Sequence, residues 1–172
     1  MFTVGILTIS DKGSKGERED KSGDVIREVV SQLNASVIDY AVIPDEKDLI
    51  AEILVEWADD EKADVIITTG GTGLSRRDVT PEATLAVVDK LAPGFVEAMR
   101  SESLKKTPHA LLSRAVAGIR HNTLIINMPG SPKAVRECLE VILPALPHAV
   151  ETLRGSAQDC AEPDFEVAEG AS

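Results

Sequence analysis

Short apolar segments alternate with longer amphipathic segments along most of the chain. Four of the short segments, residues 3–9, 36–43, 64–69 and 123–127, are rich in β-branched residues and apolar almost throughout. Such strands are typical of a parallel sheet that helices cover on both faces, because both sets of side chains are then buried. The pattern predicts four buried strands and leaves residues 115–119 open as a further short strand.

Between these strands, apolar residues recur at helical spacing, first over residues 25–33 and then over residues 49–57. A third helix is predicted at Thr80, with Thr80 as the N-cap and Pro81 in the first helical position. The remaining helices are predicted over residues 94–105, 135–142 and 146–153. This alternation predicts a three-layer α/β/α fold with a mostly parallel central sheet and right-handed crossovers.

The chain of 172 residues has a length that suits one domain. From Gly155 onward the sequence changes, since residues 155–172 contain five acidic side chains, no basic ones and little periodicity. We therefore predict one α/β domain over residues 1–154 and an acidic, flexible C-terminal tail over residues 155–172.

Composition and charge narrow the classes of function. A hydrophobic content of 43% favours a packed core, and a net charge of -11 argues against general nucleic-acid binding. No apolar run approaches the ~20 residues that a membrane span requires, and the apolar N-terminus is expected to be a buried strand rather than a signal peptide. Cys138 and Cys160 match no zinc or redox spacing, which favours a cytoplasmic location.

Polar or glycine-rich segments follow each of the four predicted strands, at residues 10–23, 44–46, 70–78 and 127–133. In an open parallel sheet, ligands bind beyond the carboxyl ends of the strands. The four segments are therefore expected to meet in one crevice.

The segment TTGGTG, residues 68–73, carries three glycines in four positions. Glycines permit positive φ and close approach, so that successive N–H groups can turn toward an anion, with the hydroxyls of Thr69 and Thr72 beside them. The pattern is neither a Walker A loop nor a GxGxxG turn, and a tight exit from the strand is an equally good interpretation. A second anion site is possible where Ser131 and Lys133 precede and begin a helix.

Asp45 and Asp78 follow different strands, and each alone would more often be a turn or cap residue. Near a phosphate cradle, the pair fits a Mg²⁺ site, because Mg²⁺ takes one or two carboxylates, keeps waters and bridges phosphate oxygens. Arg76 and Arg77 could neutralise charge on a transferring phosphoryl group. With no nucleophile elbow and no histidines at metal spacing, the site suggests transfer between two bound substrates.

The chain resembles the molybdopterin adenylyltransferase family, which includes the MogA- and MoaB-like proteins and the G domains of gephyrin and its plant counterpart. The resemblance extends over residues 3–154 and is most specific in TTGGTGLSRRDVTPEAT, residues 68–84. Further matching segments are LTISD (7–11), DKSG (20–23), IPDE (43–46), AGIRHNTLIINMPGSPKA (117–134) and ILPALPHAVETLRG (142–155).

The resemblance implies a trimeric α/β protein that joins ATP and molybdopterin, with Mg²⁺, into adenylylated molybdopterin and pyrophosphate. A MoeA-like molybdate-insertion enzyme would then use the product. It implies that Asp45 and Asp78 are the catalytic and metal-binding aspartates. It assigns the nucleotide and its phosphates to Thr69, Gly70, Gly71, Thr72, Gly73 and Arg77, and molybdopterin to Ser10, Asp20, Ser22, Gly23, Asn127, Pro129, Gly130, Ser131 and Lys133.

Two alternatives remain at this stage. The protein could be a MoaB-like scaffold that binds molybdopterin without turnover, although both aspartates and both arginines are retained. It could also be the related domain attached to nicotinamide-nucleotide recycling enzymes, which the lack of a second catalytic domain makes a weaker interpretation.

Overall fold

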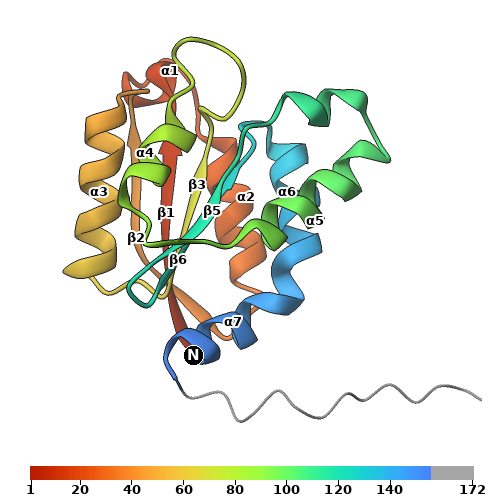
Figure 1. Cartoon of the computed structure of the whole chain (residues 1–172). Helices are drawn as coiled ribbons and strands as arrows, with labels where there is room; N and C mark the ends of the chain where they lie inside the picture. The colour runs from red at the N-terminus through yellow and green to blue at the C-terminus, as the bar shows by residue number, and fades with distance from the viewer. Residues whose placement is uncertain (156–172) are drawn as a thin grey trace, which may run out of the picture.

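The computed structural model describes residues 1–155, which form a six-stranded sheet with helices on both faces (Figure 1). The three-layer α/β/α prediction is confirmed. The predicted acidic tail lies outside the described residues except for Gly155, so the boundary between domain and tail stays a prediction.

The sheet has the order β2-β1-β3-β6-β5-β4, and β2, β1, β3 and β6 run parallel to one another. The last two strands are antiparallel, β5 to β6 and β4 to β5. The strands span Phe2–Ile9 (β1), Ala35–Ile43 (β2), Val65–Thr69 (β3), Lys90–Leu91 (β4), Ala117–Arg120 (β5) and Thr123–Met128 (β6). The four predicted strands and the optional strand near residue 117 are therefore present.

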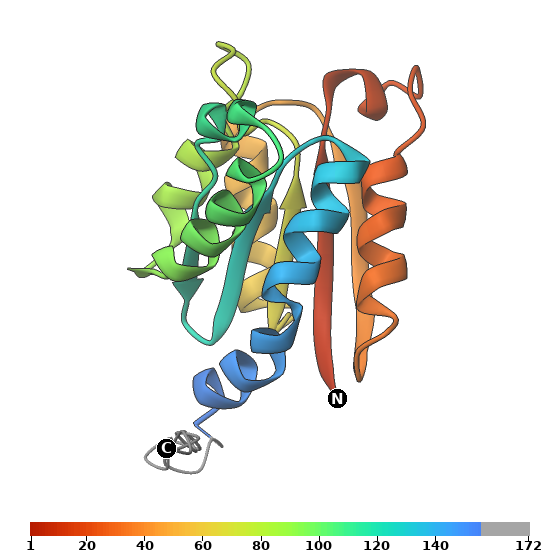
Figure 2. The ribbon, with the colours of Figure 1, turned by 90° about the vertical axis from the view of Figure 1, so that its right-hand side faces the viewer.

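Helices cover the two faces of the sheet in separate groups (Figures 1 and 2). On one face lie α3 and α4, and on the other α6 lies between α2 and α5. The helices span Asp11–Ser14 (α1), Lys21–Val30 (α2), Lys47–Asp59 (α3), Thr80–Val87 (α4), Pro93–Leu104 (α5), Pro132–Ile142 (α6) and Leu146–Leu153 (α7), with 3₁₀ turns at Pro108–Leu112 (η1) and Leu143–Ala145 (η2).

Strand periodicity divides the core into two parts. In β1, Val4 and Ile6 are buried beneath α2, α5 and α6, whereas Leu7 is buried beneath α3 and α4. Neighbouring residues of β3 alternate in the same way, because successive side chains of a strand point to opposite faces. The central strands are thus buried on both faces, as their apolar sequences predict.

Two local predictions need correction. The segment 36–43 is not buried throughout, because β2 is an edge strand whose side chains are mostly half-buried. Thr80 is not the N-cap of α4, since Val79 occupies that position without a side-chain cap. The hydroxyl of Thr80 instead donates to the carbonyl of Gly70 at 2.9 Å, which fixes the start of α4 to the glycine loop.

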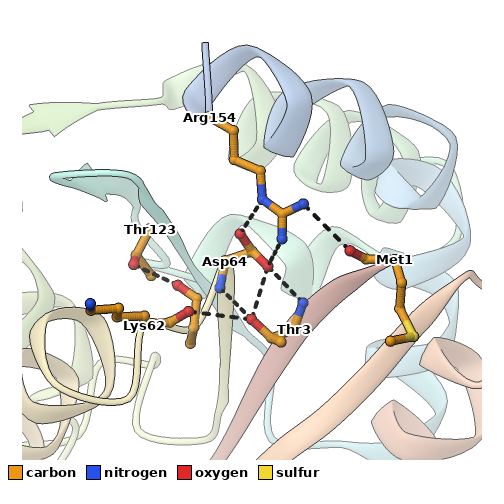
Figure 3. Close-up of polar contacts among 7 residues, drawn as sticks. Met1, Thr3, Lys62, Asp64, Thr123 and Arg154 are labelled. Atoms are coloured by element: carbon orange, nitrogen blue, oxygen red, sulfur yellow. Dashed lines mark hydrogen bonds and ion pairs between the residues drawn. The ribbon is translucent and has the colours of Figure 1, made fainter. Parts of the chain in front are cut away.

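The amino ends of β1 and β3 are tied to the end of α7 (Figure 3). The buried carboxylate of Asp64 accepts hydrogen bonds from Arg154 Nε at 2.8 Å and Nη2 at 2.6 Å. It also accepts from the main-chain N–H of Thr3 at 2.7 Å and from its hydroxyl at 2.9 Å. This network lies at the edge of the sheet opposite the polar loops (Figures 1 and 3).

Within residues 1–155, none of the helices is long and apolar enough to cross a membrane.

Candidate active site

A cleft of about 450 Å³ opens beyond the carboxyl ends of β1 and β3. Its walls come from the end of β1, the loop before α2, the start of the glycine loop and the turn before α6. The lining residues are Thr8, Ile9, Ser10, Gly13, Arg18, Glu19, Asp20, Lys21, Ser22, Thr69, Gly70, Gly130 and Pro132. Three of the four predicted segments, residues 10–23, 70–78 and 127–133, therefore contribute to one cleft at the edge where parallel sheets bind ligands. None of residues 44–46 lines it.

Asp20 organises one wall of this cleft. It is the N-cap of α2, and its Oδ1 accepts the N–H of Gly23 at 2.9 Å. Its Oδ2 accepts the hydroxyls of Thr8 and Tyr40, each at 2.6 Å. Burial raises the pKa of Tyr40, and the nearby carboxylate of Asp20 raises it further, so the phenol remains a donor at neutral pH. These bonds orient the Asp20 carboxylate toward the protein.

Two hydroxyls join the walls of the cleft to the loop after β6. Ser22 Oγ donates to the carbonyl of Gly130 at 2.8 Å, and Thr69 Oγ1 donates to the carbonyl of Pro129 at 2.7 Å. Gly130 also packs closely against Gly70. The loops after β3 and β6 are thereby held side by side, although their residues are far apart in sequence.

The glycine loop turns sharply where β3 ends. Gly70 and Gly71 have φ of +96° and +65°, in the left-handed region that favours glycine. A Cβ atom at Gly70 would lie 2.2 Å from the carbonyl oxygen of Ile9. Among residues 1–155, no acceptor pairs with the main-chain N–H groups of Gly71, Thr72 and Gly73, which remain available to an anion.

Three carboxylates, those of Asp11, Asp45 and Asp78, gather beside this loop, and none of them lines the cleft. Asp45 Oδ2 accepts the N–H of Asp11 at 3.0 Å, and Asp11 Oδ1 accepts the N–H of Asp45 at 3.1 Å. Burial raises the pKa of Asp45, and the negative charges of Asp11 and Asp78 raise it further. The close packing of like charges is the kind of environment that a bound cation stabilises.

Arg77 forms an ion pair with one of these carboxylates. Its Nε and Nη2 donate to the two carboxylate oxygens of Asp11 at 3.0 and 2.7 Å. These hydrogen bonds hold the pKa of Asp11 below its usual value. Arg77 is exposed and Asp11 is partly exposed, so the pair is open to competition from another anion.

The carboxylates fit Mg²⁺ only as a partial coordination shell. Within residues 1–155, no group of three or more His, Cys, Asp or Glu side chains is arranged to hold a metal ion. Mg²⁺ commonly takes one or two carboxylates and completes its shell with waters and substrate phosphates. Asp45 and Asp78 next to the unpaired N–H groups fit that mode, in which the cation arrives with a phosphate ligand.

The structure separates the predicted site residues into two neighbouring groups. Ser10, Asp20, Ser22, Thr69, Gly70 and Gly130 line the cleft. The second group consists of Asp45, Asp78, Gly71, Gly73 and Arg77. A Cβ atom at Gly71 would lie 3.1 Å from Asp45 Oδ1, and one at Gly73 would lie 2.9 Å from Asp78 Oδ2. Gly70 and Gly71 are the point at which the two groups meet.

Other predicted residues occupy different positions. Asn127 is completely buried, with its Nδ2 donating to Thr68 and Thr84 and its Oδ1 accepting from Val116 N–H. Its side chain is therefore used inside the protein, and its prediction as a molybdopterin contact is not supported.

Four further predicted residues, Gly23, Pro129, Ser131 and Lys133, do not line the cleft. Gly23 donates to Asp20, and Pro129 accepts from Thr69. Ser131 is the N-cap of α6, but its side chain makes no capping bond, and both Ser131 and Lys133 are exposed beside the cleft.

Sequence reasoning missed Thr8, Arg18, Glu19 and Lys21, which line the cleft. Arg18 and Glu19 precede α2 and Lys21 begins it, in a highly charged segment that resembles an ordinary solvated turn. Their position after β1 was the available signal. It distinguishes a loop at the ligand-binding edge but not the residues within it.

Comparisons with known proteins show which family the chain resembles. The family described as "Probable molybdopterin binding domain" matches residues 5–148. The molybdopterin adenylyltransferase of Helicobacter pylori strain J99 is 47% identical over 166 residues, covering 95% of this chain and 94% of the relative. That of Escherichia coli K12 is 45% identical over 139 residues, covering 80% of this chain and 71% of the relative.

Among solved structures, the molybdopterin biosynthesis enzyme MoaB of Thermus thermophilus has a TM-score of 0.86 and 54% identity. The match covers 90% of this chain and 98% of that one. The fold and the order of its loops are therefore similar to those of experimentally determined relatives.

Proposed function

The chain belongs to the molybdopterin-binding domain family, and we propose from this premise that it is a molybdopterin adenylyltransferase of molybdenum cofactor biosynthesis. The curated relatives of this name are similar over most of the chain, which favours the enzyme over a binding scaffold without turnover. In the proposed reaction, a phosphate oxygen of molybdopterin attacks the α-phosphorus of ATP. A new P–O bond forms, and pyrophosphate leaves.

The observation that carries this proposal is the meeting of the two residue groups at Gly70 and Gly71. The cleft on one side is large enough for a pterin-sized ligand, and the carboxylates and free N–H groups on the other suit a nucleotide. Two substrates bound on either side of this turn would have their phosphates adjacent. Such positioning supplies much of the catalysis in phosphoryl and nucleotidyl transfer.

We assign molybdopterin to the cleft and the nucleotide to the glycine loop. The N–H groups of Gly71, Thr72 and Gly73 would donate to phosphate oxygens, and Asp45 and Asp78 would hold Mg²⁺. When bound, Mg²⁺ would neutralise charge on the α-phosphate and the departing pyrophosphate. The exposed Arg77 would exchange Asp11 for a phosphate, since both are anionic partners for a guanidinium.

The test is pyrophosphate release by the purified protein with ATP, Mg²⁺ and molybdopterin. We expect release by the wild type, and loss of at least roughly 100-fold in D45N and D78N, because each variant removes a metal-binding charge. Molybdopterin binding, measured by fluorescence titration, should be unchanged in both.

Two results would contradict this proposal. Molybdopterin binding by the wild type without pyrophosphate release would favour the scaffold alternative. Wild-type rates of pyrophosphate release in both variants would contradict the assignment of Asp45 and Asp78 as metal ligands, but not the proposed adenylyltransferase activity.

The finer assignments rest on resemblance. We propose a homotrimer, for which exposed leucines such as Leu91 (59% exposed) and Leu111 (68% exposed) offer apolar surface. We propose that a MoeA-like enzyme receives the product. The proposed compartment is the cytoplasm, in keeping with the buried Cys138, which is free in the part of the chain that the structure describes.

A further inference from the structure

Asp78 lies at the end of an exposed loop, residues 73–78, which we call the Asp78 loop. The loop rises above the sheet in yellow-green (Figure 1). Within it, Asp78 Oδ2 accepts the N–H of Ser75 at 2.9 Å, and the N–H of Asp78 donates to the carbonyl of Ser75 at 3.0 Å. These bonds shape the loop locally but do not fix it to the rest of the protein.

One residue from a distant part of the chain binds both ends of this loop. Arg114 follows η1, and its Nε donates to the carbonyl of Gly73 at 2.7 Å. Its Nη2 donates to the carbonyl of Asp78, also at 2.7 Å. Its main-chain N–H donates to the carbonyl of Thr72 at 2.8 Å. The guanidinium therefore sets the separation between the first and last residues of the Asp78 loop.

Glu82 completes the arrangement from the first turn of α4. Its Oε1 accepts Nη1 of Arg114, and this hydrogen bond lowers the pKa of Glu82. Its Oε2 is buried and has no hydrogen-bond partner among residues 1–155, so the carboxylate engages the guanidinium through one oxygen. Arg114 thus connects the Asp78 loop to the helix that follows it.

The chemistry of the contacts requires an arginine. A guanidinium is planar and carries five N–H donors in a fixed fork, whereas an ammonium carries a point charge on a flexible stem. The two carbonyls and the carboxylate are each bound by a different nitrogen of the guanidinium, whereas the three donors of an ammonium all leave one nitrogen atom. Since Nε, Nη1 and Nη2 each donate to a protein acceptor, the side chain is engaged in supporting the loop.

We propose that Arg114 is a positioning residue for adenylyl transfer, which acts by holding the Asp78 loop so that the Asp78 carboxylate stays beside Asp45. This inference rests on the proposed function, in which Asp78 is a metal ligand. It assigns to Arg114 no contact with nucleotide or pterin. Its removal should therefore affect the metal and the nucleotide while leaving molybdopterin binding unchanged.

The kinetic test uses R114A and R114K in the full chain. In both we expect kcat to fall roughly 10- to 100-fold, because small misplacement of a catalytic group has effects of this size. The Mg²⁺ concentration for half-maximal rate should rise, and KM for molybdopterin should stay within about twofold of the wild type. R114K keeps the charge but not the fork, so its failure to restore the rate identifies geometry as the cause.

A second measurement needs no activity. Hydrogen exchange of the protein without ligands should be faster in R114A across residues 73–78 and unchanged across residues 20–23, which belong to the cleft wall. E82Q keeps an acceptor for Arg114 and should give a smaller increase over the same residues. The exchange pattern therefore reports on the loop directly.

Arg100 provides a matched control. Its Nη2 donates to the carbonyl of Ser113 at 3.1 Å, next to Arg114 in sequence but away from the Asp78 loop. R100A should leave the Mg²⁺ dependence and the exchange of residues 73–78 unchanged. If R100A changes both as R114A does, the effect is general loosening of this segment and the proposal is overturned.

The remaining outcomes separate the two hypotheses. A wild type that releases no pyrophosphate contradicts the proposed function, and the exchange data then still decide whether Arg114 holds the loop. Wild-type kcat and Mg²⁺ dependence in an active R114A protein would overturn the positioning role. If R114A does not fold, R114K with native-like circular dichroism decides the same question.

Discussion

At the scale of single residues, the direction of a side chain matters as much as its chemistry. Asp20 lines the cleft, yet three donors from Thr8, Gly23 and Tyr40 occupy its oxygens. A carboxylate held in this way connects β1, β2 and α2 and so helps to fix the shape of the cleft wall. Its effect on a ligand is then indirect. Substitution of the residues that donate to Asp20 therefore tests its role.

Substituting Tyr40 by Phe tests this indirect role. The variant removes one donor to Asp20 and should lower the free energy of unfolding by about 0.5–1.5 kcal/mol, the usual net value of such a bond. With the carboxylate less restrained, the Kd for molybdopterin should rise a few-fold and the KM for ATP should not change. Chemical denaturation and fluorescence titration measure the two effects.

The control is S31A, which removes a hydroxyl donor at the other end of α2, where Ser31 Oγ bonds the carbonyl of Glu28 at 2.6 Å. A loss of molybdopterin affinity in S31A equal to that in Y40F would mean that the stability of α2, and not Asp20, controls the cleft.

Residue types alone predicted part of the candidate site. Asp45 and Asp78 were identifiable because Asp45 follows a strand and Asp78 follows a glycine loop at the ligand-binding edge. Asn127 is the second-last residue of β6 at the same edge, but its amide is satisfied by Thr68, Thr84 and Val116 inside the protein. Nothing local in the sequence distinguishes a polar side chain that faces a cleft from one that is buried below it.

At the scale of elements, the turn from β3 into the glycine loop depends on backbone conformation. Gly71 has φ of +65°, and a Cβ there would lie 2.3 Å from Thr80 Oγ1 and 3.1 Å from Asp45 Oδ1. The turn thus brings Thr80 of α4 and the carboxylate of Asp45 so close to Gly71 that a side chain at this position would collide with them. The sequence alone showed a glycine-rich turn here, but it did not show that Thr80 and Asp45 pack against Gly71.

G71A should therefore lose both stability and activity. The left-handed conformation alone costs an L-residue roughly 1–2 kcal/mol, and displacement of Thr80 adds to that cost. We expect pyrophosphate release to fall more than stability explains, because Asp45 is displaced as well. Thermal unfolding and the transfer assay at a temperature well below the transition measure the two.

Gly16 is the matched comparison, since its φ is +72° and nothing lies within 4 Å of its Cβ position. G16A should lose stability through the same left-handed conformation but keep the wild-type rate of pyrophosphate release. Equal loss of activity in G16A and G71A would show that strain, rather than the close approach to Thr80 and Asp45, accounts for the effect.

The predictability of elements follows from the length of their patterns. Helices such as α2 and α3 contain several turns of apolar residues, so their periodicity was clear. The strand β4 has two exposed residues, Lys90 and Leu91, and so carries no alternating pattern. It forms because β5 offers an antiparallel partner, which is a tertiary rather than a local cause.

At the scale of the whole molecule, the decisive contacts join residues that are distant in sequence. Arg114 lies 41 residues from Gly73, and Arg154 lies 90 residues from Asp64. A single sequence contains no signal for either pair, because each depends on which loops the completed sheet places together. The family resemblance predicted the site residues, whereas only the three-dimensional structure shows which contacts support their loops.

The contact between Arg154 and Asp64 gives a prediction about stability and pH. Burial would raise the pKa of Asp64, but the hydrogen bonds from Arg154 and Thr3 outweigh it and hold that pKa below its ordinary value. A carboxyl whose pKa is lowered by folding stabilises the native state above its unfolded value, and this stabilisation is lost as the pH falls through the folded value. The contribution is therefore complete at neutral pH and declines below about pH 4.

R154Q should lower the free energy of unfolding at pH 7 by about 1–2 kcal/mol. The loss is smaller than for a fully buried ion pair, because Arg154 is half-exposed and solvent screens its charge. Because Asp64 becomes protonated in acid whether or not Arg154 is present, the difference between wild type and R154Q should narrow below about pH 4. Urea denaturation at neutral pH and in acid measures this difference. R136Q, which breaks the exposed pair of Arg136 with Glu28, should change stability far less than R154Q does, because solvent screens that pair. A difference that stays constant with pH would contradict the ionic role of Asp64 and leave only packing by the arginine stem to hold α7 against the sheet.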